Sequence, residues 1–147
     1  MLHRNRKEAD FHAGKWNGLG GKLEKNESPI EAAAREIFEE SGLRLPPSAF
    51  SVLGVLQFPN FKPQKHEDWI CYVVTARVPD EKITEVKPAG PEGDLSWIER
   101  AEVLQLNLWE GDKLFIPHVL ENKPFVGTIW YENGNVVRNW IAALNGS

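Results

Sequence analysis

One short segment of the chain carries a full set of signals for where a helix begins and ends. Ser28 can cap the start of a helix, Pro29 suits its first position, and Glu31 completes a capping box with Ser28. Gly42 marks the other end, because glycine readily adopts the left-handed conformation that ends many helices. The sequence therefore predicts a helix between Ser28 and Gly42, around which the rest of the chain must be arranged.

The apolar residues of this helix recur on one side. They follow the i, i+3, i+4, i+7, i+8 spacing of a buried stripe: Ile30, Ala33, Ala34, Ile37 and Phe38. At about 100° per residue, the face formed by Glu36, Glu39 and Glu40 points roughly 140° away from the centre of that stripe. We expect the stripe to dock on a core and the carboxylates to be presented on the opposite face.

The three glutamates of this face form an unusual concentration of charge. Like charges at i, i+3 and i+4 repel each other by a few tenths of a kcal/mol per pair. The ordinary explanation of such a face is that it is solvated surface. The other explanation is a cation, and hard divalent ions, Mg²⁺ above all, bind carboxylates together with substrate phosphates.

The size and charge of the chain limit what it can bind. Its 147 residues suffice for one domain with a core, and 41% hydrophobic and 26% charged residues are ordinary for a globular protein. A net charge of −4 argues against a large non-specific nucleic-acid footprint. An acidic protein that handles phosphates must do so through metal ions and local donors. We therefore expect a single domain over residues 1–147, without stable nucleic-acid binding.

Cysteine usage and hydropathy indicate a cellular location. Cys71 is the only cysteine, so no intrachain disulfide can form, which fits a reducing cytoplasm. The first seven residues contain no apolar stretch like that of a signal peptide. No apolar run approaches the roughly 20 residues of a membrane span. We expect a cytoplasmic protein that does not bind membranes.

The remaining elements are short and mixed. Strands are expected over residues 50–58, 69–78, 95–98, 125–130 and 135–140, the last two flanking the hairpin signal Asn133-Gly134. Helical turns are expected over residues 100–104 and 110–120, with a kink or break at Pro117. Residues 16–24 should form a glycine-rich turn that passes into a short strand, and residues 4–15, 59–67 and 80–94 should be loops. Without a regular βαβ alternation, the predicted class is α+β.

Residues 21–43 resemble the signature of the Nudix hydrolases, G-x5-E-x7-R-E-U-x-E-E-x-G-U, where U is aliphatic. Every defined position is filled: Gly21, Glu27, Arg35, Glu36, Ile37, Glu39, Glu40, Gly42 and Leu43. The resemblance extends from about Phe11 to Trp140 and is similar to the MutT-like subgroup that acts on oxidised purine nucleoside triphosphates. It implies the Nudix fold, a mixed sheet between helices. In this family a long first strand and most of a second usually precede the position of Met1, so we expect the usual first strands to be lacking.

The resemblance also implies a metal site and its surroundings. Glu36 and Glu40 would be the main ligands of Mg²⁺ or Mn²⁺, with Glu39 assisting and the carbonyl of Gly21 as a further ligand. Arg35 would orient the carboxylates through a bidentate pair.

Two further glutamates have implied roles outside the ligand set. Glu27 would tie the loop to the helix. Glu92, five residues before Trp97, would complete the metal site or help to activate water. The alternative for Glu92 is a solvated loop acid.

Substrate contacts are implied for a second set of residues: Asn17, Lys22, Trp109, Asp112, Phe11 and Phe58. Trp109 would stack on a purine, Asn17 and Asp112 would read its edge, and the two phenylalanines would form pocket walls. Simpler alternatives are a turn residue for Asn17, a packing aromatic for Trp109 and a helix-start acid for Asp112. One departure from the subgroup is Gly111, where a second aspartate is found in the family member with paired aspartates.

Together these residues imply a Mg²⁺-dependent pyrophosphohydrolase of oxidised purine nucleoside triphosphates such as 8-oxo-dGTP. It would release the monophosphate and pyrophosphate and so cleanse the nucleotide pool that feeds DNA synthesis. The nucleoside triphosphate would be its main partner, and the protein would be a monomer or homodimer. The alternatives are a Nudix hydrolase of an RNA 5′-triphosphate end or a nucleotide sugar, and a catalytically silent nucleotide-binding module.

Overall fold

The computed structural model describes residues 1–5 and 13–144. Tertiary contacts divide the chain into two compact units. The first unit comprises Met1–Ser51 and Ala76–Leu108, and the second comprises Val52–Thr75 and Trp109–Ser147. The single domain over residues 1–147 stays a prediction. Phe11, the predicted pocket wall, lies outside the described residues.

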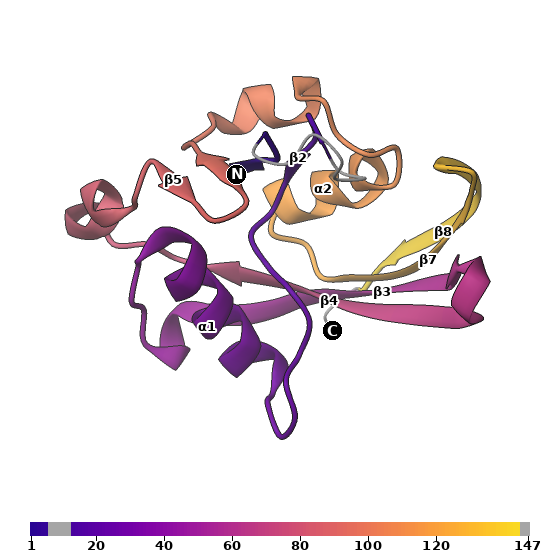
Figure 1. The fold of residues 1–147 in the computed structure, drawn as a ribbon, viewed down its shortest axis with the longest axis horizontal. Coiled ribbons are helices and arrows are strands. Elements are labelled where there is room, and N and C mark those ends of the chain that lie inside the picture. Colours follow the sequence, from indigo (N-terminus) through magenta and orange to yellow (C-terminus); the bar gives the residue numbers. More distant parts are fainter. Residues whose placement is uncertain (6–12, 145–147) are drawn as a thin grey trace. The chain divides into compact units, whose positions relative to one another are not determined.

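The first unit contains a sheet of four very short strands (Figure 1). They are β1 (Leu2–His3), β2 (Trp16–Asn17), β5 (Ala89–Gly90) and β6 (Gly93–Leu95), in the order β2-β1-β6-β5. β1 pairs antiparallel with both β2 and β6. Leu2, at 1% exposure, anchors the sheet in the unit's core. The strand β2 precedes the glycine-rich segment, so the prediction of a short strand after that turn was wrong.

The predicted helix is present as α1 (Pro29–Ser41) in the first unit. The Ser28 side chain accepts a hydrogen bond from the Glu31 N–H, and the Glu31 side chain accepts one from the Ser28 N–H. Gly42 adopts φ 76°, in the left-handed region where glycine is favoured. Both ends of α1 therefore form through the local signals that predict them.

The faces of α1 differ from the expectation. Its buried residues are Ala32, Glu40 and Ser41, whereas Phe38 is 39% exposed and lies under the Arg44 guanidinium, 3.9 Å from its ring centre. The prediction that the apolar stripe docks and that Glu40 faces solvent was therefore wrong at these two residues. The reason lies outside the helix, because the backbone of Gly90 in β5 packs against the carbonyl of Glu40 and covers the end of α1.

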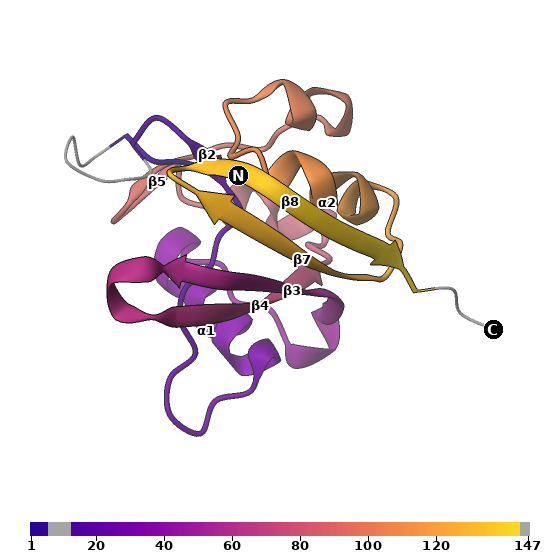
Figure 2. The ribbon, with the colours of Figure 1, turned by 90° about the vertical axis from the view of Figure 1, so that its right-hand side faces the viewer.

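The second unit is built on a mixed sheet (Figures 1 and 2). Its strands are β3 (Phe50–Lys62), β4 (Glu67–Ala76), β7 (Phe125–Glu132) and β8 (Asn135–Ala143), in the order β4-β3-β7-β8. β3 runs parallel to β7, and β7 pairs antiparallel with β8 across the predicted Asn133-Gly134 turn. The core of the unit consists of buried apolar side chains from two of these strands: Leu53, Leu56, Phe125 and Ile129.

The helix α2 (Asp112–Leu120) lies within the predicted helical segment 110–120 and packs on this core through Leu114, Phe115 and Val119. It continues through Pro117, so of the predicted kink or break the break is wrong, and the kink stays a prediction. Within residues 1–5 and 13–144, no helix has both the length and the apolar character needed to cross a lipid bilayer.

The segment 80–94 is more ordered than predicted. It contains the 3-10 helix η3 (Asp80–Glu85) and the β5–β6 hairpin, whereas a loop was expected. The expected strand over residues 95–98 is present only at Leu95, the last residue of β6. Three other 3-10 helices lie in the described parts: η1 (Pro47–Ala49), η2 (Pro63–Lys65) and η4 (Arg100–Gln105), the last at the predicted helical turn. The combination of two sheets with few helices confirms the α+β class.

Candidate metal and catalytic site

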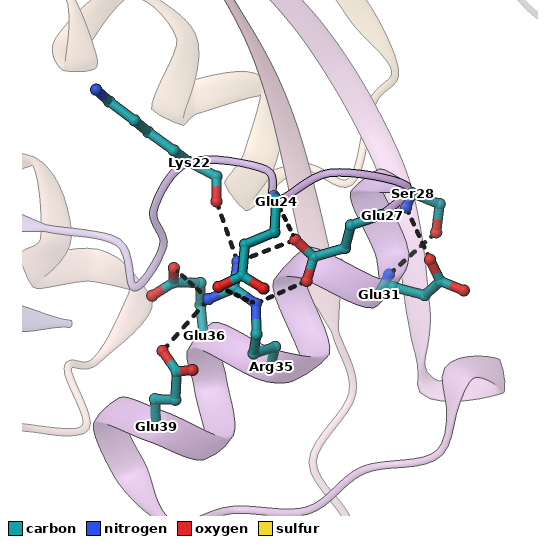
Figure 3. A network of polar contacts seen from close by, with 8 residues as sticks. All are labelled: Lys22, Glu24, Glu27, Ser28, Glu31, Arg35, Glu36 and Glu39. Atoms are coloured by element: carbon teal, nitrogen blue, oxygen red, sulfur yellow. Dashed lines mark hydrogen bonds and ion pairs between the residues drawn. The ribbon is translucent and has the colours of Figure 1, made fainter.

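Arg35 is the centre of a polar network that fixes the loop before α1 to the helix (Figure 3). Its Nε and Nη2 donate to the two carboxylate oxygens of Glu27, at 2.6 and 3.0 Å, and Nη2 also donates to the Lys22 carbonyl at 3.0 Å. Glu27 in turn accepts a 2.7 Å hydrogen bond from the Glu24 N–H. The Arg35 hydrogen bonds lower the pKa of Glu27, which keeps this carboxylate charged. The loop that carries Gly21 and Lys22 is thus tied to the helix through Glu27, the role its position implied.

The same guanidinium also holds two of the box glutamates. Arg35 Nη1 donates to Glu36 at 2.8 Å and to Glu39 at 3.3 Å. Hydrogen bonds to Glu27 and Glu36 raise the pKa of Arg35, so the cation is permanent. Figure 3 shows Glu36 and Glu39 converging on Arg35 from successive turns of α1. Arg35 therefore offsets the mutual repulsion of these two carboxylates.

Glu40 stands apart, because it is buried and faces another acid. Its residue exposure is 5%, and its neighbour is Glu92. Burial first, and then the charges of Glu92 and Glu36, raise the pKa of Glu40 from its ordinary value to about 7, while Arg4 opposes the shift. Two carboxylates can share a hydrogen bond only when one of them is protonated. Among the described residues the ionised Glu40 Oε2 has no hydrogen-bond donor.

Glu92 lies at the tip of the β5–β6 hairpin, which places it next to Glu40. The turn residues Pro91 and Glu92 lie between paired Gly90 and Gly93. A Cβ at Gly90 would collide with the Glu40 carbonyl, and a Cβ at Gly93 would collide with the His3 carbonyl. Only residues without a side chain allow both close approaches, so the hairpin is held between α1 and β1 with Glu92 at its tip.

These residues fit a divalent cation by their chemistry and position. Glu40 Oε2 is a buried oxygen that needs a positive partner, and carboxylate oxygens are what Mg²⁺ binds. The backbone of Gly21 lies so close to the Glu36 carboxylate that a Cβ would collide with it. In the described ranges no three His, Cys, Asp or Glu side chains are already arranged around one point. Glu36 would have to exchange its Arg35 partner for the ion.

The predicted site residues are therefore brought together in part. Gly21, Arg35, Glu36 and Glu39 belong to one network, and Glu40 meets Glu92 beside it. Glu92, for which a solvated loop acid was the alternative, interacts with Glu40 and with Arg4 while its side chain is 37% exposed, and its role in the metal site stays a prediction.

Arg4 is a residue that the sequence did not single out. Its Nη1 donates to Glu92 Oε2 at 3.0 Å, and the two side chains are 19% and 37% exposed. Its chain position, in a segment predicted as polar loop, gives no sign of this contact, because the partner lies 88 residues away. Only the pairing of β1 with β6 brings the two together.

The predicted base-contact residues belong to different units. Asn17 lies in β2 of the first unit, half-buried and paired with Leu2. Trp109, Asp112 and Phe58 lie in the second unit. Lys22 presents its carbonyl to Arg35, while its side chain extends away from the network (Figure 3). The contact of these residues with a nucleotide stays a prediction.

Tyr131, which the sequence did not single out, connects part of the second-unit set. Its ring centre is 6.2 Å from that of Phe58, and its hydroxyl accepts a 2.7 Å hydrogen bond from the Gly111 N–H. Burial, with smaller contributions from the charges of Asp112 and Glu110, raises the pKa of Tyr131 to about 12, and the hydrogen bond from Gly111 opposes the shift. Phe58 and the start of α2 therefore lie around one tyrosine.

Comparison with known proteins agrees with this geometry. Residues 1–119 match the model of the NUDIX domain. The zebrafish (Danio rerio) protein named oxidized purine nucleoside triphosphate hydrolase is 28% identical over 131 residues, covering 89% of this chain and 79% of the relative. The mouse (Mus musculus) protein of the same name is 26% identical over 134 residues, covering 91% and 81%.

A solved structure extends the agreement to the fold. The crystal structure of a mutator MutT protein from Bacillus halodurans superposes with a TM-score of 0.79 at 28% identity, covering 95% of this chain and 86% of that one. The family match spans well over half of the chain and includes the whole of α1. The chain therefore belongs to the Nudix family of hydrolases.

Proposed function

We propose that this chain is a Mg²⁺-dependent pyrophosphohydrolase of purine nucleoside triphosphates, including oxidised ones such as 8-oxo-dGTP. Water would attack a phosphorus of the triphosphate chain, and the products would be the nucleoside monophosphate and pyrophosphate. The observation that carries the proposal is the buried Glu40 carboxylate facing Glu92 beside the Arg35 network. The names of the zebrafish and mouse relatives support the substrate class.

The acids around α1 would hold the metal. Glu36, Glu39, Glu40 and the carbonyl of Gly21 are the proposed ligands, and Mn²⁺ could replace Mg²⁺. When bound there, a divalent ion neutralises charge on the phosphate oxygens and lowers the pKa of a bound water. Its positive charge would also satisfy Glu40 Oε2, which otherwise needs a proton.

The protein's own groups would position the reaction. Arg35 keeps Glu36 and Glu39 close to the loop of Gly21, which would hold both carboxylates near the proposed ion. Glu92, fixed at the tip of the hairpin, would accept the proton of the attacking water. The oxygen of that water would bond to phosphorus, the P–O bond to the leaving phosphate would break, and the bond's electrons would leave with pyrophosphate or the monophosphate.

The purine base would be held by the predicted substrate-contact residues. We assign stacking to Trp109 and edge contacts to Asn17 and Asp112, with Phe58 and Phe11 as walls and Lys22 on the phosphates. Base stacking on an aromatic contributes roughly 1–3 kcal/mol. The shared neighbour Tyr131 supports a common location for Phe58 and the start of α2. We place the enzyme in the cytoplasm, acting on free nucleotides as a monomer or homodimer.

A substrate panel tests the proposal. The purified protein with Mg²⁺ is given 8-oxo-dGTP, dGTP, a nucleotide sugar and a 5′-triphosphorylated RNA, and kcat/KM is measured for each. We expect the oxidised nucleotide to rank first. A higher kcat/KM for the sugar or the RNA would overturn the substrate class, and tight nucleotide binding by calorimetry without any turnover would identify a silent binding module instead.

A further inference from the structure

We infer that Arg4 is a positioning residue that holds Glu92 in its place beside Glu40. The inference rests on the proposed function, because it concerns how the proton acceptor of that reaction is oriented. Arg4 belongs to no part of the signature in residues 21–43.

The backbone of Arg4 is fixed on both sides. Its N–H donates to the Lys15 carbonyl at 2.9 Å, and its own carbonyl accepts from the Gly14 N–H at 2.7 Å. It directly follows β1, whose His3 pairs with Trp16 of β2 and Asp94 of β6. The side chain of Arg4 therefore starts from a constrained point beside the β5–β6 hairpin.

The side chain of Arg4 reaches the acid at the hairpin tip. Its Nη1 donates to Glu92 Oε2 at 3.0 Å, a charge-assisted contact of the stronger kind. Arg4 is 19% exposed and Glu92 37%, so solvent screens this pair only in part. The pair holds the carboxylate of Glu92 through its Oε2 atom.

The Arg4–Glu92 contact restricts the side-chain conformation of Glu92, which the hairpin backbone alone does not. Gly90 and Gly93 fix the backbone of the turn, but they leave the rotamer of Glu92 undetermined. Removing a group that orients a catalytic or metal-binding carboxylate typically lowers activity or metal affinity by about 10- to 100-fold. Arg4 is the group that the structure assigns to this role.

A neighbouring pair offers a matched control. Asn5 Nδ2 donates to Asp94 Oδ2 at 2.7 Å, and the Asp94 N–H donates to Asn5 Oδ1 at 3.3 Å. Asn5 thus joins the same segment to the same hairpin without touching Glu92. Asn5→Ala removes a comparable structural tie and leaves the Arg4–Glu92 pair in place.

The test is a double-mutant cycle on the full chain with Mg²⁺ and 8-oxo-dGTP. Arg4→Gln, Arg4→Lys, Glu92→Gln, the Arg4→Gln/Glu92→Gln double variant and Asn5→Ala are compared for kcat, KM, Tm and the Kd of Mn²⁺ by calorimetry. We expect Arg4→Gln to lower kcat by about 10- to 100-fold with KM changed less than about threefold. Arg4→Lys should recover part of the loss, and Asn5→Ala should keep the wild-type kcat.

The decisive comparison is in the Glu92→Gln background. If Arg4 acts through Glu92, Arg4→Gln causes no further loss of kcat there. Independent, multiplying losses would overturn the inference, and so would a rise in KM at unchanged kcat, which would identify Arg4 as a direct phosphate ligand. An equal loss of kcat in Asn5→Ala would show that Arg4 only stabilises the fold of this segment, which would also overturn the inference. Absence of turnover in the wild-type protein would instead overturn the proposed function itself, and the inference with it.

Discussion

The backbone N–H of Gly111 donates a 2.7 Å hydrogen bond to the hydroxyl of Tyr131. The approach is so close that a Cβ at position 111 would collide with that hydroxyl and lie 3.0 Å from Cζ. Gly111 occupies the position at which the family member with paired aspartates has its first aspartate. The close approach of Tyr131 explains why this chain has glycine there. Gly111 and Tyr131 are a matched pair, and an aspartate at 111 would not fit beside this tyrosine.

Substitution at Gly111 should therefore depend on Tyr131. We expect Gly111→Ala to destabilise the protein by about 1–3 kcal/mol, the usual cost of overpacking. In a Tyr131→Phe background, where the hydroxyl is absent, the same substitution should cost clearly less. Urea unfolding of the four proteins of this cycle measures the coupling, and strictly additive free energies would contradict the pairing.

The stability of the metal-free protein should fall as pH rises toward neutrality. The folded-state pKa of Glu40 is about 7, above its ordinary value of 4.5, so the folded protein binds this proton more tightly than the unfolded chain. The resulting stabilisation is fully present below pH 4.5 and is lost as pH rises through 7. We expect a loss on the order of 1–3 kcal/mol from this group between these values.

The control for this pH effect is Glu40→Gln, which cannot ionise. Urea unfolding in the presence of a chelator should show a smaller fall between pH 4.5 and 8 for this variant. Adding Mg²⁺ at about 100 times its Kd at pH 8 should restore roughly 2.7 kcal/mol to the wild-type protein. Identical pH profiles for the two proteins would refute the assignment to Glu40.

The capping box of α1 should contribute measurably to stability. Ser28→Ala removes the acceptor for the Glu31 N–H and should cost about 1 kcal/mol in the free energy of unfolding. Glu31→Gln should cost less than Glu31→Ala, because glutamine can still accept from the Ser28 N–H. Thermal unfolding of the three variants checks the order. Equal Tm values for the glutamine and alanine variants would show that the Glu31 side chain does not cap.

A side chain at Gly21 should weaken metal binding. A Cβ there would collide with the Glu36 carboxylate and displace it from the loop. We expect Gly21→Ala to raise the Kd of Mn²⁺ by at least about tenfold, as disturbed ligand positioning generally does. Gly20→Ala is the matched control, since nothing lies within 4 Å of the added atom. Calorimetric titrations that give both variants the wild-type Kd would remove Glu36 from the ligand set.

The sequence predicted those parts of the structure that local contacts determine. Both ends of α1 follow from Ser28, Glu31 and Gly42, all within a few residues of the groups they satisfy. The β7–β8 hairpin follows from the turn signal Asn133-Gly134 between the two expected strands. Such features form through neighbouring residues, so the pattern in the chain suffices.

The parts that were missed depend on contacts between distant residues. Glu40 is buried because Gly90 packs on its carbonyl, and no helical pattern of α1 contains that information. The β5–β6 hairpin is only two and three residues per strand, too short for an alternation to be recognised. Arg4 meets Glu92 across 88 residues, so its place near the site becomes visible only in three dimensions.

Phosphorus NMR observes the proposed hydrolysis reaction directly. 8-oxo-dGTP is incubated with the protein and Mg²⁺, alongside a reaction with excess chelator and one with Glu40→Gln. We predict that the Mg²⁺ reaction yields monophosphate and pyrophosphate in equal amounts, that the chelator abolishes it, and that Glu40→Gln slows it by about 10²- to 10⁴-fold. Release of orthophosphate and diphosphate, or full activity in Glu40→Gln, would contradict it.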